Sequence, residues 1–403
     1  MTDSYFNVPL YNDLSSQISS FLRGGSGSTL PFFNKADLIQ AMPNGFMTLS
    51  LEHAVKQGKT EYANTSGSSA MLTIIRPAGW WSVEFAAAYG SVPEMAGYHI
   101  ASDRKAVLST PVCSASSCQV NNSSFAERNT EGVLNLNMHR DPNQWTSTDI
   151  ERIDGELHEF APALLEVNPS YLAMFLHKRN HYGINRPLFN PKWITTSYEL
   201  MTRRHQAIIE AAYNAPILKM YGSTELGVLF IQNSQGKFLH HTRDHILELR
   251  PVFPLRRIHE LIVTSWKNPF MPLLRYCTGD LVQIQAEQDA QGLFTEAHPL
   301  IIERLHGRLN DMVTLANGEV LTATELDDEV FRSLPSAFQY EYRRGVNSTP
   351  DRIHVVSTCR GGEATSGPDK IPDTVYIRPG CAIPIKWVQS LASQVSGKFV
   401  SVR

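Results

Sequence analysis

Helical segments alternate with short apolar strands over residues 80–227, and no other feature of the chain restricts its fold as strongly. The pattern predicts helices over residues 80–89, 150–165 and 169–181, and a strand over residues 106–112. Such alternation is typical of a mostly parallel sheet flanked by helices, which is an α/β fold. Ligands bind these sheets at the carboxyl ends of the strands, so we expect a functional site where a strand ends.

One such strand end carries both a hydroxyl and a carboxylate. Residues 215–220 predict a short buried strand, and the turn that follows it is Tyr221-Gly222-Ser223-Thr224-Glu225. Glycine lets the backbone pass close to a ligand, Thr224 can donate to a phosphate oxygen, and Glu225 has the hard oxygens that Mg²⁺ prefers. The same residues also suit the N-cap of a helix, so the turn alone leaves both interpretations open.

A second glycine and hydroxyl cluster precedes the apolar residues 71–75. Its members are Thr65, Ser66, Gly67, Ser68 and Ser69. Backbone N–H groups around a glycine, with hydroxyls on both sides, can surround a triphosphate. The tip of a serine-rich β-hairpin is the alternative that these residues leave open.

Beyond residue 236 the predicted elements become short strands and turns. Strands are expected over residues 239–241, 246–249 and 260–264. A further strand, fixed by Pro272, is expected to end in a turn that contains Asp280. The Asp280 carboxylate can accept hydrogen bonds from a ribose diol, or it can simply close an Asx-type turn.

Composition places the chain among ordinary globular proteins. Of its 403 residues, 42% are hydrophobic and 19% are charged, which is enough for one large domain and a smaller one. The net charge of −3 gives no field that would attract a polyanion, so nucleic acid is not an expected partner. No segment has the character of a membrane span and the first residues carry no secretory signal, so we expect a cytoplasmic protein without a membrane partner.

The cysteines and histidines give no metal-site pattern. Among the five cysteines, Cys113 and Cys118 bracket four small residues, but no second Cys or His pair follows at zinc-site spacing. We interpret both as free thiols. His240, His241 and His245 are close in sequence, yet no carboxylate or cysteine lies at ligand spacing, so a metal site is not expected there.

Five motifs, in order, give the chain a resemblance to a known family. They are TSGSSA (65–70), YGSTELG (221–227), YCTGDLV (276–282), HGRLNDMV (306–313) and SGKF (396–399). Together they resemble the motifs of the adenylate-forming superfamily, which comprises acyl-CoA synthetases, adenylation domains and luciferases. The closer likeness is to phenylacetate-CoA ligases, including homologues used in capsule and phenazine antibiotic biosynthesis. It rests on NVPLY (7–11), LPFFNKADL (30–38) and MPLLRY (271–276).

The resemblance implies a role for each matching residue. The loop that holds the β- and γ-phosphates is matched by Thr65, Ser66, Gly67, Ser68 and Ser69. Thr224 matches the residue that contacts the α-phosphate, Glu225 the magnesium ligand, and Lys398 the lysine that enters the site for adenylation. The remaining nucleotide contacts would come from Ser197, Tyr198, Glu199, Tyr221, Gly222, Ser223, Asp280 and Arg308.

The resemblance also implies a domain organisation. Residues 1–309 would form a large N-terminal domain of mostly parallel sheets flanked by helices, with a small β subdomain. Residues 310–403 would form a small, mobile α+β C-terminal domain, as in acyl-CoA synthetases, with a strand over residues 353–358 and a helix over residues 387–395. Asn310 falls on the hinge position about which this domain rotates in the family.

A member of this family would use ATP and Mg²⁺ to convert a carboxylic acid into an acyl-adenylate. The branch implies an aromatic acid, and Tyr171 and Phe175 are candidate contacts that equally suit a helix core. The acyl group would pass to CoA or, alternatively, to an amine, an alcohol or a reductase partner. A role in secondary metabolite or antibiotic biosynthesis is expected, and a homodimer is compatible with it.

Two positions near the phosphate loop depart from the family pattern. Ala70 and Thr73 stand where glycine and lysine are usual, so neither position carries a basic side chain. The alternative function is therefore a catalytically impaired nucleotide-binding partner protein of the same fold. A serine hydrolase is not expected, because the chain lacks a G-x-S-x-G nucleophile elbow.

Overall fold

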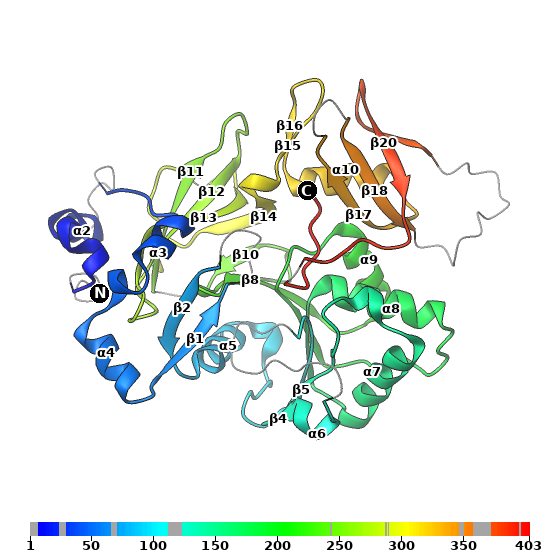
Figure 1. Ribbon diagram of the computed structural model, residues 1–403, viewed down its shortest axis with the longest axis horizontal. Helices are drawn as coiled ribbons and strands as arrows, with labels where there is room; N and C mark the ends of the chain where they lie inside the picture. Colours follow the sequence, from blue (N-terminus) through cyan, green and yellow to red (C-terminus); the bar gives the residue numbers. More distant parts are fainter. Residues whose placement is uncertain are drawn as a thin grey trace. The chain divides into compact units, whose positions relative to one another are not determined.

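The computed structural model describes residues 7–23, 30–65, 71–111, 123–241, 244–286, 288, 290–345, 350–357, 372–394 and 396–403. The described residues form two compact units. The first unit contains residues up to 96 and residues 220–305, and the second contains residues 97–111, 123–219 and 306–403. Figure 1 labels many of the elements of both units.

The first unit begins with short helices and a hairpin. These elements are α2 (Ser15–Leu22), α3 (Lys35–Ala41), α4 (Leu49–Lys56), β1 (Thr60–Asn64), β2 (Thr73–Pro77) and α5 (Trp80–Gly90). A capping box starts α3, because Asn34 accepts hydrogen bonds from the first helical N–H groups and Asp37 accepts one from Asn34 N. β1 and β2 are antiparallel neighbours, with Asn64 opposite Thr73 (Figure 1).

A sheet with antiparallel pairs forms the rest of the first unit, in the strand order β11-β12-β13-β14-β10-β9-β8. Its strands are β8 (Ile217–Ser223), β9 (Gly227–Gln232), β10 (Phe238–His240), β11 (His245–Pro251), β12 (Ile258–Ser265), β13 (Leu273–Ile284) and β14 (Ile301–Arg308). The predicted strands over residues 246–249 and 260–264 are confirmed as parts of β11 and β12. Phe230, Leu261 and Leu274, all fully buried, belong to the core that this sheet shares with Phe21 and Leu38 of the helices.

The second unit contains the predicted parallel sheet, in the order β8-β7-β6-β3-β5-β4. Its elements are β3 (Lys105–Leu108), α6 (Phe125–Arg128), β4 (Asn129–Thr130), β5 (Val133–Asn135), α7 (Ser147–Phe160), β6 (Leu164–Val167), α8 (Pro169–His181), β7 (Trp193–Thr196) and α9 (Arg203–Ala212). β3, β5, β6, β7 and β8 pair in parallel, and only β4 pairs antiparallel among the described strands of this sheet. α8 contacts both α7 and α9 (Figure 1). The α/β class predicted from the alternation is therefore confirmed.

β8 belongs to both units. Residues 217–219 pair with β7 in the second unit, and residues 220–223 pair with β9 in the first. The parallel pairing of the first half changes to antiparallel pairing in the second half. The motif residues that begin at Tyr221 lie in the antiparallel half.

A separate hydrophobic core lies within residues 313–402 of the second unit. The elements around it are β15 (Val313–Thr314), β16 (Val320–Leu321), α10 (Ala323–Ser333), β17 (Ala337–Arg343), β18 (Arg352–Ser357), β19 (Thr374–Arg378) and β20 (Cys381–Trp387). Four of these strands form a sheet in the order β17-β18-β20-β19, and Val402 forms a parallel bridge with Tyr342 of β17. The boundary at residue 310 stays a prediction.

The predicted helix over residues 387–395 is wrong. Trp387 ends β20, and Val388 N donates to Val355 O at 2.8 Å, so the chain continues beside β18 instead of coiling. A turn follows, in which Gln394 N donates to Lys398 O at 2.8 Å. Pairing with a neighbouring strand outweighs the local helical periodicity here.

Candidate functional site

The predicted turn lies at the tip of a β-hairpin in the first unit. Gly222 pairs with Val228 and Ser223 with Gly227, so Thr224 and Glu225 occupy the turn between β8 and β9. A strand follows the turn, which excludes the helix N-cap interpretation of these residues. The hydroxyl and the carboxylate therefore lie at a strand end, as predicted.

Gly227 fixes the approach of this hairpin to α5. Its φ is +74°, and an added Cβ would lie 2.1 Å from Glu84 Oε2. Glu84 is 2% exposed, accepts a hydrogen bond from Val228 N at 3.0 Å and forms an ion pair with Lys267 at 2.8 Å. Sequence analysis missed Glu84 and Lys267, because a buried ion pair between distant residues leaves no local pattern.

Asp280 and Tyr221, predicted to bind ribose and adenine, contact each other. The Tyr221 hydroxyl donates to Asp280 Oδ2 at 2.8 Å. The register between β12 and β13 is irregular next to Asp280, and Gly279 has a φ of +73°. Asp280 therefore lies in a bulge within β13, and the expectation that the strand ends there is wrong. A bulge re-aims a side chain without ending the sheet.

Two further contacts hold the turn. Tyr276 OH donates to Glu225 Oε1 at 2.9 Å, and Arg76 Nη1 donates to Thr224 O at 3.3 Å. Arg76 is fully buried and pairs with Glu61 at 2.7 Å. Burial lowers the pKa of Arg76, and the Glu61 carboxylate opposes this effect. We call Tyr221–Glu225 with Tyr276 and Asp280 the turn cluster.

The chemistry of the turn cluster fits ATP and Mg²⁺. Ser223 Oγ is buried and has no hydrogen-bond partner among the described residues, so it is free to bind a ligand oxygen. Glu225 uses one carboxylate oxygen with Tyr276, which leaves the other for a cation. Mg²⁺ bound with a nucleotide needs only one or two protein carboxylates, because phosphates and water complete its shell.

Thr65 is the one residue of the predicted phosphate loop that the structure describes. Thr65 N donates to Leu72 O at 2.9 Å, and Leu72 N donates to Thr65 Oγ1 at 3.1 Å. The two residues thus extend the β1–β2 hairpin by one further pair. Ser66, Gly67, Ser68 and Ser69 lie outside the described residues, as do Cys113 and Cys118.

The other predicted site residues lie in the second unit. Ser197, Tyr198 and Glu199 follow β7, and Tyr198 adopts a left-handed backbone with φ of +76°. The Tyr198 hydroxyl donates to Glu166 Oε1 at 2.7 Å, and Glu199 Oε2 accepts a hydrogen bond from Phe399 N at 3.0 Å. A non-glycine residue in this conformation is uncommon and often marks a functional segment.

Lys398 comes close to Glu199, whereas Arg308 stands beside Asp311. Burial raises the pKa of Glu199, and hydrogen bonding to Ser170 and the positive charge of Lys398 lower it in part. Arg308 is exposed at the end of β14, and its charge lowers the pKa of Asp311, which burial raises. The structure thus brings together two predicted residues, Glu199 and Lys398, that are distant in sequence.

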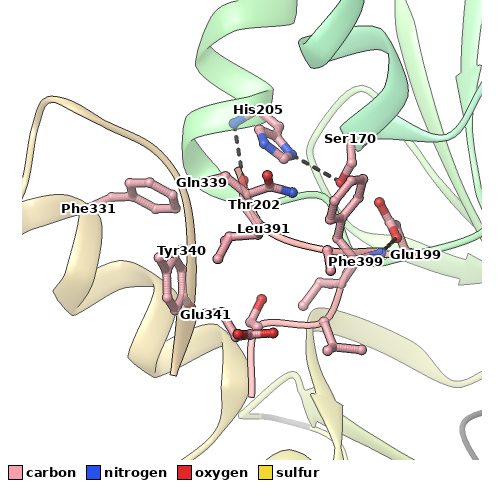
Figure 2. Close-up of a pocket in the computed structure, with 14 residues that line it drawn as sticks. Ser170, Glu199, Thr202, His205, Phe331, Gln339, Tyr340, Glu341, Leu391 and Phe399 are labelled. Carbon is pink, nitrogen blue, oxygen red and sulfur yellow. Dashed lines mark hydrogen bonds between the residues drawn. The ribbon is translucent and has the colours of Figure 1, made fainter. Parts of the chain in front are cut away.

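A small cavity of about 30 Å³ adjoins Glu199 (Figure 2). His205 and Phe399 line it, and the dashed lines in Figure 2 join Glu199 to Phe399 N, and His205 to both Ser170 and Thr202. Gln339 Oε1, which also lines the cavity, is buried without a hydrogen-bond partner among the described residues. A polar cavity of this size accommodates ordered water and is too small for a metabolite.

Tyr171 and Phe175, the candidate contacts for an aromatic acid, are fully buried in the core of the second unit. Tyr171 instead contacts the backbone beside Lys398, because its hydroxyl lies 2.9 Å from Gly397 O. Of the two interpretations that the sequence left open, the helix core is the one that the structure favours. Sequence analysis gave no sign of the contact between Tyr171 and Gly397.

Of the three neighbouring histidines of the first unit, His245 is fully buried, and His240 and His241 are half-buried. Burial lowers the pKa of His240 and of His241 to about 4, and lowers that of His245 further. Neutral, buried imidazoles are the ordinary state for core histidines. The described part of the chain contains no group of three or more His, Cys, Asp or Glu side chains arranged to bind a metal ion.

No helix within the described ranges combines the length and the apolar character needed to cross a membrane.

Comparison with solved structures identifies the fold. A 2-hydroxyisobutyryl-CoA ligase, in the postadenylation state with R3-HIB-AMP, superposes with a TM-score of 0.67 over 100% of this chain and 86% of its own, at 15% identity. The chain has the acyl-CoA ligase fold. The predicted resemblance and fold class are therefore confirmed at the level of the fold.

Other acyl-CoA ligases share the fold at similar distances. The anthranilate CoA ligase AuaEII, in complex with anthranoyl-AMP, matches with a TM-score of 0.53 and 15% identity over 84% of this chain and 65% of its own. A benzoate CoA ligase from Burkholderia xenovorans LB400 matches with a TM-score of 0.52 and 14% identity over 84% of this chain and 66% of its own.

Sequence comparison gives a more limited result. Protein CapK of Staphylococcus aureus is 26% identical over 178 residues, which is 43% of this chain and 38% of CapK. The match thus spans well under half of that relative. No protein-family model matches the chain.

Proposed function

We propose that this protein uses ATP to activate a carboxylic acid as an acyl-adenylate. The observation that carries the proposal is the turn cluster. There, the buried Ser223 hydroxyl has no partner among the described residues and lies in the same motif as the Glu225 carboxylate and the Tyr221–Asp280 pair. The acyl-CoA ligase fold supports it, since solved structures with that fold contain acyl-AMP. Domains at residues 1–309 and 310–403 are part of the proposal.

In this reaction an oxygen of the acid attacks the α-phosphorus of ATP. A new P–O bond forms, the bond to the bridging oxygen of the β-phosphate breaks, and pyrophosphate leaves with that electron pair. Both reactants are anionic, so the protein must align them and neutralise charge. We propose that the Lys398 ammonium neutralises the charge that develops at the α-phosphate. We propose that Thr224 donates a hydrogen bond to an oxygen of the same phosphate. Mg²⁺ held by Glu225 would supply further positive charge to the phosphates.

The nucleotide would be bound by the remaining predicted residues. Tyr221 and Asp280 suit adenine and the ribose diol, because their hydrogen bond fixes an aromatic ring beside a carboxylate. Gly222 and Ser223 would contact the phosphates, as would the loop that begins at Thr65. Arg308, always cationic, suits a nucleotide contact at the edge of the C-terminal region.

An aromatic acid is the substrate class that we propose. The support is a row of rings along α5, where Phe85 stacks on Trp81 at 5.3 Å and on Tyr89 at 5.6 Å between ring centroids. The Arg76 guanidinium lies 5.2 Å from the centroid of the Trp81 ring and also bonds to Thr224 O, which ties the row to the turn cluster. Trp81 and Phe85 remain partly exposed.

The acyl acceptor that we propose is CoA. The support is again the fold, because a solved 2-hydroxyisobutyryl-CoA ligase structure holds both an acyl-AMP and CoA. An amine, an alcohol or a reductase partner is the competing acceptor. The partial match to CapK is compatible with a biosynthetic role, including the antibiotic biosynthesis predicted from sequence.

The test is acid-dependent release of pyrophosphate by the whole chain with ATP and Mg²⁺. The panel should contain benzoates, phenylacetates and short hydroxy acids, with acyl-AMP identified by mass spectrometry and CoA added in a second series. We expect release with at least one aromatic acid. ATP binding without turnover on any acid would overturn the proposal. It would favour the alternative of a catalytically impaired nucleotide-binding partner protein, which Ala70 and Thr73 suggest.

A further inference from the structure

Lys398 lies in a tight turn whose backbone is closed on itself. Gln394 N donates to Lys398 O and Gly397 N donates to Gln394 O, both at 2.8 Å. These bonds fix the shape of residues 396–399, which we call the lysine turn. They do not fix where the turn sits, because all of them are internal to the segment.

Tyr171 provides one external attachment for the lysine turn. Its hydroxyl lies 2.9 Å from Gly397 O and 3.0 Å from Arg140 O, so one proton is shared between two carbonyl groups. The Tyr171 ring is fully buried in α8 and packs edge-on against Trp145 at 5.7 Å between centroids. A fully buried side chain thus holds the carbonyl group of the residue before Lys398.

Gly397 makes this close contact possible. Its φ is +79°, and an added Cβ would lie 2.5 Å from Thr110 Oγ1 and 2.6 Å from Tyr171 OH. Any other residue would have to push the turn away from Tyr171 and adopt an unfavourable backbone. This contact with Tyr171 therefore requires glycine at the position before Lys398.

Glu199 provides the second attachment, on the other side of Lys398. Its Oε2 accepts a hydrogen bond from Phe399 N at 3.0 Å, and its Oε1 is buried. The positive charge of Lys398 acts on the same carboxylate. The hydrogen bond restrains the backbone of the turn, and the electrostatic attraction favours a position of the ammonium near the carboxylate.

We propose that Glu199 and Tyr171 are positioning residues that hold the lysine turn and thereby orient the Lys398 ammonium. This deepens the proposed function and rests on it, because it assumes that Lys398 serves adenylation. Glu199 then acts through Lys398 rather than through adenine. Tyr171 acts through the backbone of Gly397.

The two attachments can be separated by conservative variants. Glu199→Gln keeps an oxygen that can accept the Phe399 N–H bond but removes the charge that attracts Lys398. Tyr171→Phe keeps the ring in its core and removes the hydroxyl. Matched controls are Glu210→Gln, an exposed glutamate of α9, and Tyr213→Phe, whose buried hydroxyl has no partner among the described residues.

The first measurement needs no substrate. Acetylation of Lys398 by acetic anhydride, followed by mass spectrometry, should be slower than that of the exposed Lys386 in the native chain. We expect Glu199→Gln and Tyr171→Phe each to speed Lys398 acetylation several-fold and to leave Lys386 and both control variants unchanged. Unaltered Lys398 reactivity in both variants would overturn the proposal, whether or not the enzyme activity is ever found.

The second measurement is a double-mutant cycle on the adenylation rate, made once an acid substrate is identified. Glu199→Gln should lower the rate about tenfold with little change in ATP affinity, because small displacements of a catalytic group cost this much or more. In a Lys398→Ala background the same change should have no further effect. Equal rate losses with and without Lys398 would show that Glu199 acts elsewhere, on the nucleotide for example, and would also overturn the proposal.

Discussion

The turn cluster and the lysine turn are held in different ways. In the turn cluster, the strands β8 and β9 pair on both sides of Thr224 and Glu225, and the side chains Tyr221 and Asp280 bond to each other. The lysine turn is attached through the side chains of Tyr171 and Glu199, and the backbone bridge to β17 lies beyond it, at Val402. The turn cluster is thus held largely by the strands that flank its motif, whereas the lysine turn is held by residues that are distant in sequence.

This difference explains which functional residues can be identified from the sequence and which need the structure. A hairpin positions several adjacent side chains at once, so the functional residues of the turn cluster appear together as a motif. A turn held by single side chains needs partners from other elements, and these partners carry no motif of their own. The variants below test how far each group depends on its supports.

The largest effect is expected from Lys398→Ala. Loss of one well-placed cationic donor should lower the adenylation rate by about 10²- to 10³-fold, with ATP affinity nearly unchanged, because the charge is needed mainly as the reaction proceeds. The measurement is pyrophosphate release, together with calorimetric titration of ATP. Lys386→Ala, which removes an exposed lysine of β20, is the control. An unchanged adenylation rate in Lys398→Ala would show that the lysine turn has no role in the reaction.

The next effect is structural and concerns the support of the turn cluster. Glu84→Ala leaves Lys267 buried without its partner and Val228 N without its acceptor, which should cost about 3 kcal/mol of unfolding free energy. Glu84→Gln should cost less, because an amide oxygen can still accept from Val228 N. Denaturant titration measures both, with Glu52→Ala on the exposed face of α4 as control. A loss below about 1 kcal/mol in Glu84→Ala would mean that the hairpin is supported mainly by its ladder.

Local patterns of the sequence were enough for much of the fold. α8 runs over Pro169–His181 as predicted, because a proline at its start and an uninterrupted helical pattern define it. The helix expected over residues 150–165 instead ends at Phe160, and Leu164 begins β6. The helix predicted over residues 387–395 is wrong, because the hydrogen bond of Val388 to β18 joins segments that are distant in sequence.

The candidate site divides in the same way. The motif residues Tyr221, Glu225 and Asp280 were identified from sequence, and the structure brings all three into one cluster. Their supports, Glu84 and Arg76, were not identified, because a charged residue in a helix or strand gives no local sign of burial. Glu199 was identified for a nucleotide contact, and its bond to Phe399 N could be found only from the fold.

The third prediction compares the buried histidines of the two units by changing pH. His205 in the second unit has its pKa lowered to about 4 by burial, as do His240 and His241 in the first. The unfolded chain binds these protons below about pH 6.5, and the folded chain binds them only near pH 4. Stability should therefore be complete above pH 6.5 and be lost progressively as the pH falls toward 4.

For His205 alone the loss between pH 6.5 and 5 should be about 2 kcal/mol. Denaturant titrations at several pH values measure this loss of unfolding free energy. In His205→Gln the total loss between pH 6.5 and 5 should be smaller by this amount. His240 and His241 should contribute less each, because both remain partly exposed. A stability that does not change with pH over this range would contradict the burial of these imidazoles.

The smallest effect is expected within the turn cluster, and it separates two of its hydrogen bonds. Tyr276→Phe removes the donor to Glu225 Oε1, so the carboxylate loses one restraint on its orientation, at a cost of about 1 kcal/mol. If Glu225 binds Mg²⁺, the Mg²⁺ concentration for half-maximal adenylation should rise about fivefold. Tyr221→Phe removes the donor to Asp280 instead and should raise the KM for ATP while leaving the Mg²⁺ dependence as it was. The same Mg²⁺ dependence in both variants would mean that the turn cluster acts as one unit, because its two bonds could not then be assigned to separate ligands.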